Sequence, residues 1–184
     1  ILNRQAEKLG LAVIGYRLVP TDNSMIGNSA VAVEPSIEQL FVKRPDSVKD
    51  VETFERKLYV LRNYATRIVK ETLNNQVVND RFYFASFSSR TIIYKGQLMT
   101  AQVQQYFLDL QRAEMVSALA VVHSRFSTNT FPSFKLAQPF RYIAHNGEIN
   151  TVKGNVNWIR AQEALLTSTV FTKEEIEMLL PICD

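Results

Sequence analysis

The sequence contains few cysteines and has no long apolar run. Its single cysteine, Cys183, cannot form an internal disulfide framework, so a reducing compartment is expected, either the cytoplasm or a plastid stroma. No apolar stretch approaches the roughly 20 residues that span a bilayer. The first residues lack the basic start and apolar core of a signal peptide. These absences exclude a disulfide-rich scaffold and predict no membrane partner.

A dense basic patch is also missing. The net charge is +3, and the one close pair of basic residues, Lys43 and Arg44, is followed by Pro45 and Asp46. Nucleic-acid binding normally requires a concentrated basic surface, so no nucleic-acid partner is expected. Hydrophobic residues make up 46% and charged residues 21% of the 184 residues, which is typical of a globular chain. This length favours a single domain over residues 1–184.

Helical periodicity is clearest over residues 50–73. Seven residues recur there at alternating spacings of three and four, which places them on one stripe of a helix. They are Val51, Phe54, Leu58, Leu61, Ala65, Ile68 and Thr72. Asp50 or Ser47 is a candidate for the N-cap of this helix. Shorter helices are predicted over 101–110, 152–166 and 173–180, with Thr172 and Glu175 forming a capping box at the start of the last.

Alternating, β-branched and aromatic residues predict the strands. The expected strands cover 9–20, 30–33, 37–43, two strands within 81–96 around a turn at Ser88–Arg90, a strand buried on both faces over 118–127, and its neighbour over 142–149. The order of strands and helices predicts an α+β domain whose central strands are covered on both sides.

One candidate site segment is His123–Thr130, with the sequence HSRFSTNT. It follows the predicted buried strand, so its polar groups would emerge where a strand leaves the core. Arg125 offers a planar set of donors that suits a carboxylate, and Thr128 adds a short hydrogen-bonding side chain. The alternative is a polar loop in which Arg125 forms a structural ion pair.

The second candidate segment is His145–Asn150, with the sequence HNGEIN. An Asn-Gly pair often marks a tight hairpin turn, which is the simpler interpretation. The chemical interpretation is an oxyanion hole, in which the Asn146 amide and the Gly147 backbone N–H donate to the oxygen that becomes negative during attack on an amide. His123 and His145 lack further metal ligands, so structural roles are expected for both.

Together these segments resemble the class II glutamine amidotransferase domain of the glutamate synthase family. The longer run QPFRYIAHNGEINTVKGNVNW, residues 138–158, carries the resemblance to glutamate synthases in particular. EQLFVKR and YKG further upstream are also similar. Asparagine synthase and glucosamine-phosphate synthase share only the shorter motifs, and the run after Glu148 disfavours them.

The resemblance implies an amino-terminal-nucleophile fold, a four-layer α/β/β/α sandwich of two antiparallel sheets, incomplete in this chain. It implies that Arg125 holds the α-carboxylate of glutamine and that Thr128 and Glu148 contribute to substrate binding. It also implies that Asn146 and Gly147 form the oxyanion hole, in agreement with the roles expected from their chemistry.

The chain departs from the family pattern at its nucleophile. An amino-terminal nucleophile needs a thiol or hydroxyl on the residue with the free amine, and Ile1 has neither. We expect the family's cysteine upstream of Ile1, and an aspartate that binds the substrate's amino group just beyond Asp184. Cys183 is expected to be an unreactive packing residue. The 184 residues alone are therefore expected to be inactive.

The implied parent enzyme hydrolyses glutamine and transfers the ammonia to 2-oxoglutarate, using FMN and an iron–sulfur cluster. Its implied partners are the remaining synthase domains and an electron donor, either a reduced-nicotinamide subunit or ferredoxin. This segment has neither a cysteine set for a cluster nor a Gly-x-Gly-x-x-Gly motif, so no cofactor is expected to bind it. The alternative function is a non-catalytic glutamine-binding or structural module of the same fold.

Overall fold

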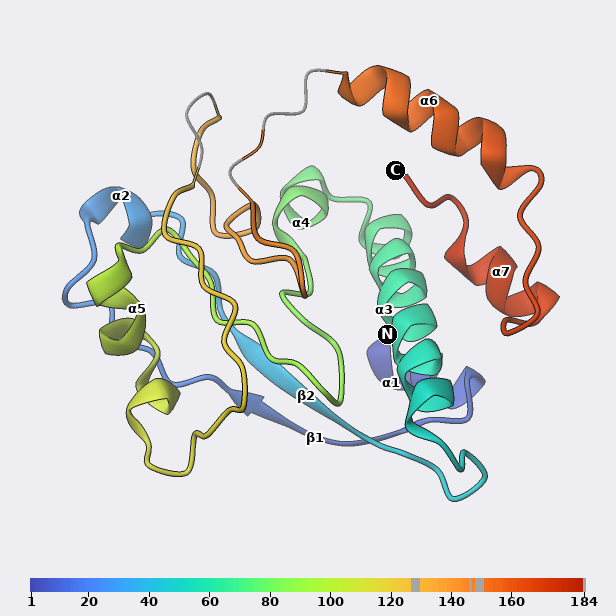
Figure 1. Ribbon diagram of the computed structural model, residues 1–184, viewed down its shortest axis with the longest axis horizontal. Helices are drawn as coiled ribbons and strands as arrows, with labels where there is room; N and C mark the ends of the chain where they lie inside the picture. The colour runs from blue at the N-terminus through green and yellow to red at the C-terminus, as the bar shows by residue number, and fades with distance from the viewer. Residues whose placement is uncertain (127–129, 146, 148–150, 184) are drawn as a thin grey trace. The chain divides into compact units, whose positions relative to one another are not determined.

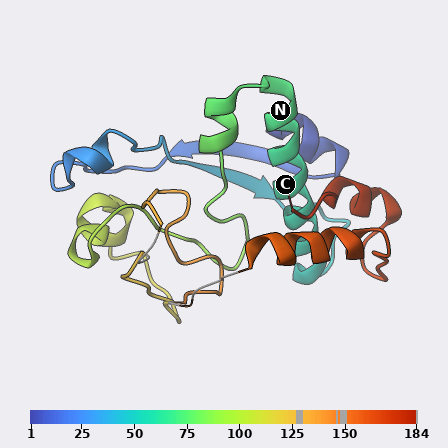
Figure 2. The same cartoon turned by 90° about the horizontal axis from the view of Figure 1, so that it is seen from above.

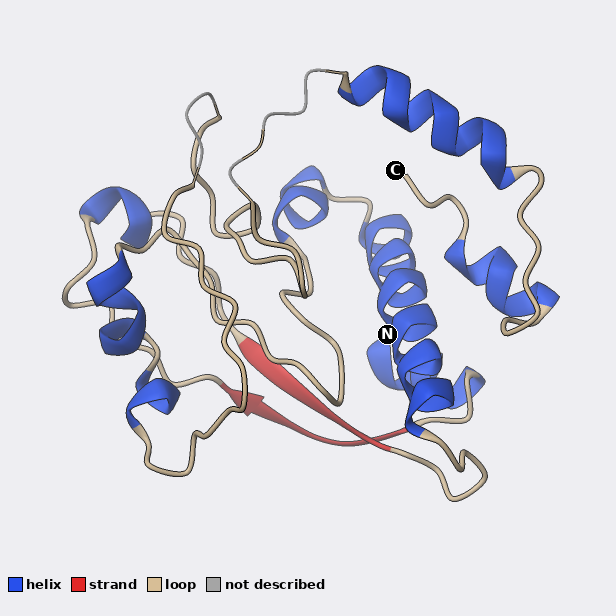
Figure 3. Cartoon of the chain, viewed as in Figure 1, coloured by secondary structure: helices blue, strands red, loops and turns tan. Residues whose placement is uncertain are grey.

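The computed structural model of the protein describes residues 1–126, 130–145, 147 and 151–183. The chain divides into two compact units. The first unit consists of 1–12, 44–80 and 147–184, and the second of 13–43 and 81–146. Figure 1 shows the elements along the chain, and Figure 3 separates helices, strands and loops.

The first unit is built on the long helix α3, Val51–Leu73. The short helix α1, Leu2–Lys8, and the later helix α7, Lys173–Leu179, both pack against α3. The other helices of this part of the chain are α4, Gln76–Arg81, and α6, Val152–Glu163. Every one of these elements except α1 and α4 falls on a helix that the sequence predicts.

The ends of α3 follow local signals in the sequence. The Asp50 carboxylate accepts a hydrogen bond from Thr53 N at 2.7 Å, so Asp50 is the N-cap. Asn74 ends the helix in the left-handed conformation, with φ of 40°. The buried stripe is slightly rotated from the predicted one. It consists of Phe54, Leu58, Val60, Leu61, Ala65 and Val69.

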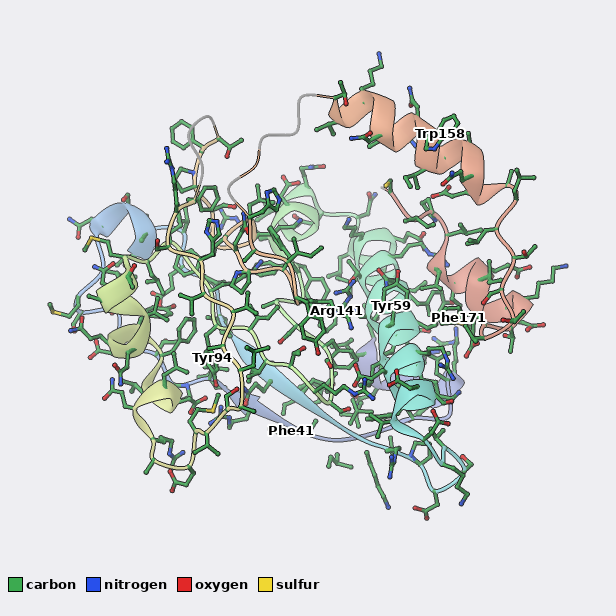
Figure 4. The ribbon with its side chains drawn as sticks, in the orientation of Figure 1. Phe41, Tyr59, Tyr94, Arg141, Trp158 and Phe171 are labelled. Carbon is green, nitrogen blue, oxygen red and sulfur yellow. The ribbon has the colours of Figure 1, made fainter. Side chains whose placement is uncertain are left out.

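Specific contacts join α7 to α3. The rings of Tyr59 and Phe171 lie 6.4 Å apart at an interplanar angle of 45° (Figure 4). Arg67 donates to the backbone oxygens of Glu177, at 3.3 Å, and of Leu180. These last carbonyls of a helix have no partner within it, so a guanidinium is a suitable donor there. The predicted capping box of Thr172 and Glu175 is confirmed, with bonds of 3.2 and 2.9 Å.

The second unit contains a two-stranded antiparallel sheet of β1, Ala12–Leu18, and β2, Glu38–Lys43 (Figures 1 and 2). Both strands are predicted by the sequence. Exposure alternates along β1, as the two-residue period of a strand requires. The short helices α2, Asn28–Val31, and α5, Thr100–Tyr106, and the 3-10 helix η1, Leu108–Gln111, complete this unit's regular elements among the described residues.

An aromatic cluster forms the core of the second unit. Tyr106 and Phe107 are almost fully buried, and their rings meet edge-to-face with centroids 4.7 Å apart. Tyr94 meets Phe107 in the same way at 5.0 Å. The Tyr94 hydroxyl donates to buried Asp109, which also pairs with Arg17 of β1. This pairing lowers the pKa of Asp109, since a guanidinium hydrogen bond favours the charged carboxylate.

Two predicted strand regions are not strands. Residues 30–33, predicted as a strand, instead belong largely to α2 and the turn after it. Residues 82–96, predicted as two strands, contain no strand, and Arg81 ends α4. Serine hydroxyls replace backbone partners in this segment. Ser86 Oγ accepts from Ile93 N at 3.2 Å, and Ser88 Oγ accepts from Arg90 N at 3.1 Å.

The prediction of a buried strand over 118–127 is also wrong for its described part. Residues 118–126 are irregular, and Leu119 and Val122 are 73% and 76% exposed. The predicted neighbour over 142–149 is irregular where it is described, apart from one isolated bridge between Phe140 and Ile143. An apolar run becomes a buried strand only when neighbouring strands and a covering layer are present, and the described residues supply neither here.

The α+β class is confirmed, whereas the four-layer sandwich stays a prediction. No helix in the described residues is both long and apolar enough to cross a membrane.

Candidate functional site

Two of the five predicted site residues are described by the structure. Arg125 is an exposed side chain in the irregular stretch before residue 127, and Gly147 is exposed in the first unit. Thr128, Asn146 and Glu148 lie outside the described residues. The roles of all five residues therefore stay predictions, and the contacts around them carry the structural argument.

The backbone of His145, the first residue of the HNGEIN segment, is held by the side chain of Gln138. Gln138 Oε1 accepts a hydrogen bond from His145 N at 2.7 Å. Gln138 Nε2 donates to His145 O at 2.6 Å. A primary amide carries one acceptor and two donors, so it can bond both backbone groups of a single residue. This pairing fixes the local direction of the chain immediately before Asn146.

The ring of His123 reaches the same carbonyl. His123 Nε2 lies 2.9 Å from His145 O. Because a carbonyl oxygen only accepts, the Nε2 atom must carry a hydrogen in this contact. His145 O thus receives two donors, which matches its two lone pairs. The contact agrees with the structural role expected of His123, and it joins the first residues of the HSRFSTNT and HNGEIN segments.

Residues 132–140, which lead to this contact, are anchored to residues 95–97. Gln97 Nε2 donates to Pro132 O at 2.8 Å, and Lys95 Nζ donates to Lys135 O at 2.7 Å. Phe134 packs so closely on Gly96 that a Cβ added there would lie 2.7 Å from the Phe134 ring. The YKG segment, residues 94–96, therefore supports the backbone that carries Gln138.

Lys95 is a buried amine between two aromatic rings. Its Nζ lies 4.5 Å from the ring centroid of Phe140 and 5.6 Å from that of Tyr83. Burial lowers the pKa of Lys95 to about 8, because removing an ammonium from water costs more than removing the neutral amine. Burial likewise raises the pKa of the Tyr83 hydroxyl.

Helix α6 begins at Val152. Thr151 precedes this helix, and Asn155 N donates to Thr151 O at 3.1 Å. Trp158 is 68% exposed on α6 (Figure 4). The residues that extend the motif beyond HNGEIN thus form a surface helix.

Cys183, the single cysteine, is half-buried in the tail after α7. Among the described residues, no group of three or more histidine, cysteine, aspartate or glutamate side chains lies together as metal ligands would.

Sequence reasoning assigned no role to Gln138 or Lys95, although both lie in segments that it singled out. Gln138 begins the QPFRY run, and Lys95 is the centre of YKG. A glutamine that binds backbone groups leaves no spacing pattern in a sequence. The one available signal is a polar residue directly before a proline, between Lys135 and Arg141.

Comparison with known families accounts for this combination of segments. A model of the family described as "Glutamine amidotransferases class-II" matches residues 1–184. The chain belongs to the class II glutamine amidotransferases. This membership covers both units, including the described residues on either side of the HNGEIN segment.

Individual relatives within the class II glutamine amidotransferases are more specific. Over 184 residues the chain is 49% identical to "Glutamate synthase [NADH]" of Schizosaccharomyces pombe, covering 97% of this chain and 8% of the relative. It is 47% identical to "Glutamate synthase [NADPH] large chain" of Bacillus subtilis, covering 98% of this chain and 11% of the relative. It is 43% identical to "Ferredoxin-dependent glutamate synthase, chloroplastic" of Oryza sativa subsp. japonica, covering 92% of this chain and 10% of the relative. The chain thus spans about a tenth of the length of these relatives.

Proposed function

We propose that this chain is part of the glutaminase of a glutamate synthase, which hydrolyses glutamine to glutamate and ammonia for transfer to 2-oxoglutarate. The observation that carries the proposal is the similarity to glutamate synthases along almost the whole chain, at 49% identity over 184 residues in one relative. Class II membership supports glutamine as the substrate.

The site chemistry follows from the residue types. In this proposal Arg125 pairs with the α-carboxylate of glutamine, and Thr128 and Glu148 complete substrate binding. The Asn146 amide and the Gly147 N–H stabilise the oxyanion that develops when the side-chain amide of glutamine is attacked. The contact between His123 and the His145 backbone supports this arrangement, since it links the two segments that carry these groups.

We assign no nucleophile within the 184 residues. Cys183 is the only thiol, and it lies in the tail after α7, within the first unit. The proposed reaction proceeds through a thioester of a cysteine elsewhere in the parent protein. Glutamine's γ-amide nitrogen leaves as ammonia when the thioester forms, and water then releases glutamate.

We also propose the four-layer architecture for the complete domain. Ile14, Tyr16 and Leu18 lie on one face of β1 and are 66%, 50% and 66% exposed. An apolar strand face of this kind is typical of a sheet that packs against a second layer. In this proposal a second sheet covers that face in the intact protein.

The iron–sulfur cluster of the proposed parent enzyme does not fit this chain, and in this proposal FMN also binds elsewhere in the parent. Such clusters take several cysteine thiolates, and the chain has one cysteine. The relatives' names include NADH, NADPH and ferredoxin, which supports one of these as the electron donor of the parent.

Ammonia release from glutamine by the full-length protein that contains this sequence tests the proposal. Arg125→Ala should raise KM about 10- to 100-fold, because hydrogen bonds to a charged group contribute about 1.5–3 kcal/mol. Arg4→Ala, which removes an exposed arginine on α1, is the matched control and should leave KM unchanged. Glutamine binding without ammonia release would instead favour the non-catalytic module.

A further inference from the structure

The amide of Gln138 makes two hydrogen bonds to a single residue, His145, whose carbonyl belongs to the peptide group leading into Asn146. His145 is exposed, so water could satisfy its N–H and C=O equally well. The side-chain bonds are therefore not needed to satisfy buried polar groups. Their effect is to restrict the backbone at the start of the His-Asn-Gly element.

We propose that Gln138 is a positioning residue for the oxyanion donors, acting through the backbone of His145. This inference rests on the proposed glutaminase function. An oxyanion donor is effective only when it is already aimed at the developing charge, and a displacement of about 1 Å can cost about 100-fold in rate. The two bonds hold the N–H and the C=O of His145, so they restrict the backbone on both sides of the His145 Cα atom, one residue before Asn146.

His123 extends the same restraint to the substrate-binding segment. Its Nε2 donates to His145 O at 2.9 Å, and Arg125 follows it by two residues. The proposed carboxylate-binding and oxyanion segments thus share one anchor, the backbone of His145. Gln138 is in turn half-buried in the stretch that Lys95 holds through Lys135 O.

Steady-state glutaminase kinetics of Gln138→Ala in the full-length protein test the inference. We expect kcat to fall about 10- to 100-fold while KM and inhibition by the product glutamate change less than about twofold, because a positioning residue affects the transition state more than the bound ground state. A variant with a merely structural defect would instead lose thermal stability, and its kcat would not fall at a nearly constant KM.

Gln102 provides a matched control, since its amide also accepts one backbone hydrogen bond and donates another, here with two different residues away from the candidate site. Gln102 Oε1 accepts from Met99 N at 2.8 Å, and Gln102 Nε2 donates to Met25 O at 2.5 Å. Gln102→Ala should leave kcat and KM unchanged. An equal loss of kcat in Q102A and Q138A would overturn the inference.

Gln138→Glu supplies a second variant with a pH signature. Its carboxylate can accept from His145 N but has no hydrogen for His145 O, so kcat should be low at neutral pH. Protonation restores a donor, so the ratio of Q138E to wild-type kcat should rise as pH falls towards about 5, near the glutamate pKa. If Q138A does not fold, Q138E alone tests the inference. A Q138E variant whose kcat equals that of the wild type at every pH would overturn it. An inactive wild type would overturn the proposed function itself, whereas an active wild type with unaffected Gln138 variants overturns only this inference.

Discussion

Helix α3 and the stretch from residue 112 to 145 differ in how their conformation is held. In α3 the apolar residues lie on one buried stripe, and its ends carry an N-cap and a left-handed residue. In 112–145 the apolar side chains of Val116, Leu119 and Phe131 are 83%, 73% and 95% exposed. Within this stretch Phe134 and Ala137 are buried, and side-chain hydrogen bonds to the backbone, from Gln138 and Lys95, add to that anchor. A chain segment can thus be fixed by a continuous apolar stripe or by a few buried side chains together with polar contacts, and the described residues near the candidate site use the second means.

The largest expected effect on this comparison comes from Leu61→Ala. Leu61 is fully buried on α3, so its truncation leaves a cavity and should lower the free energy of unfolding by about 2–5 kcal/mol. Leu119→Ala is the matched control, since that side chain is largely exposed, and it should change stability by less than about 0.5 kcal/mol. Denaturant titrations of both variants measure the difference. Equal losses would show that the 112–145 stretch is packed as tightly as α3.

The next effect is the pH dependence caused by Lys95. Its pKa of about 8 lies below that of a lysine in the unfolded chain, so the unfolded chain binds more protons above pH 8. The free energy of unfolding should therefore rise by about 2 kcal/mol as the pH increases from 8 to 10 and buried Lys95 loses its proton. Above pH 10 the raised pKa values of Tyr83, Tyr94 and Tyr106 act in the opposite direction. Unfolding at several pH values checks this, and Lys95→Met should remove the rise. A wild-type profile identical to that of K95M would contradict the assignment.

A smaller effect is expected from Gly96→Ala. The added Cβ would lie within 3 Å of two ring atoms of buried Phe134, and overpacking of this kind costs about 1–3 kcal/mol. Gly15→Ala on β1 meets no atom within 4 Å and should not destabilise the protein. Thermal unfolding of the two variants tests whether the YKG segment supports residues 132–140. Wild-type stability of G96A would show that Phe134 moves aside freely.

The smallest effect is expected at the start of α7. Thr172→Ala removes the hydroxyl that accepts from Glu175 N and should cost about 1 kcal/mol. Thr172→Ser keeps this oxygen and should lie close to wild type. Chemical denaturation resolves the pair, and a T172A value equal to that of T172S would mean that the cap contributes nothing.

The sequence predictions are accurate for three helices and inaccurate for several strands. The helices at 50–73, 152–166 and 173–180 are confirmed, because cap residues and a period of 3.6 are local properties. The strands predicted at 81–96 and 118–127 are wrong in the described residues, because strand formation depends on a partner that the local sequence does not supply. In the candidate site, the segments around His123 and His145 were identified by their residue types. The contact of Gln138 with the His145 backbone was not.

The sequence by itself determined the family, the helices α3, α6 and α7, and the two segments whose residue types suit glutamine chemistry, because motifs and helical signals are written in neighbouring residues. Only the tertiary structure decided that Gln138 and His123 meet at the His145 carbonyl, and that Lys95 is buried between two rings. The contacts of Gln138 and His123 with His145 join residues 7 and 22 positions apart, and the hydrogen bond from Lys95 to Lys135 O joins residues 40 positions apart. Such separations are set by how the intervening chain folds back, which no local pattern encodes.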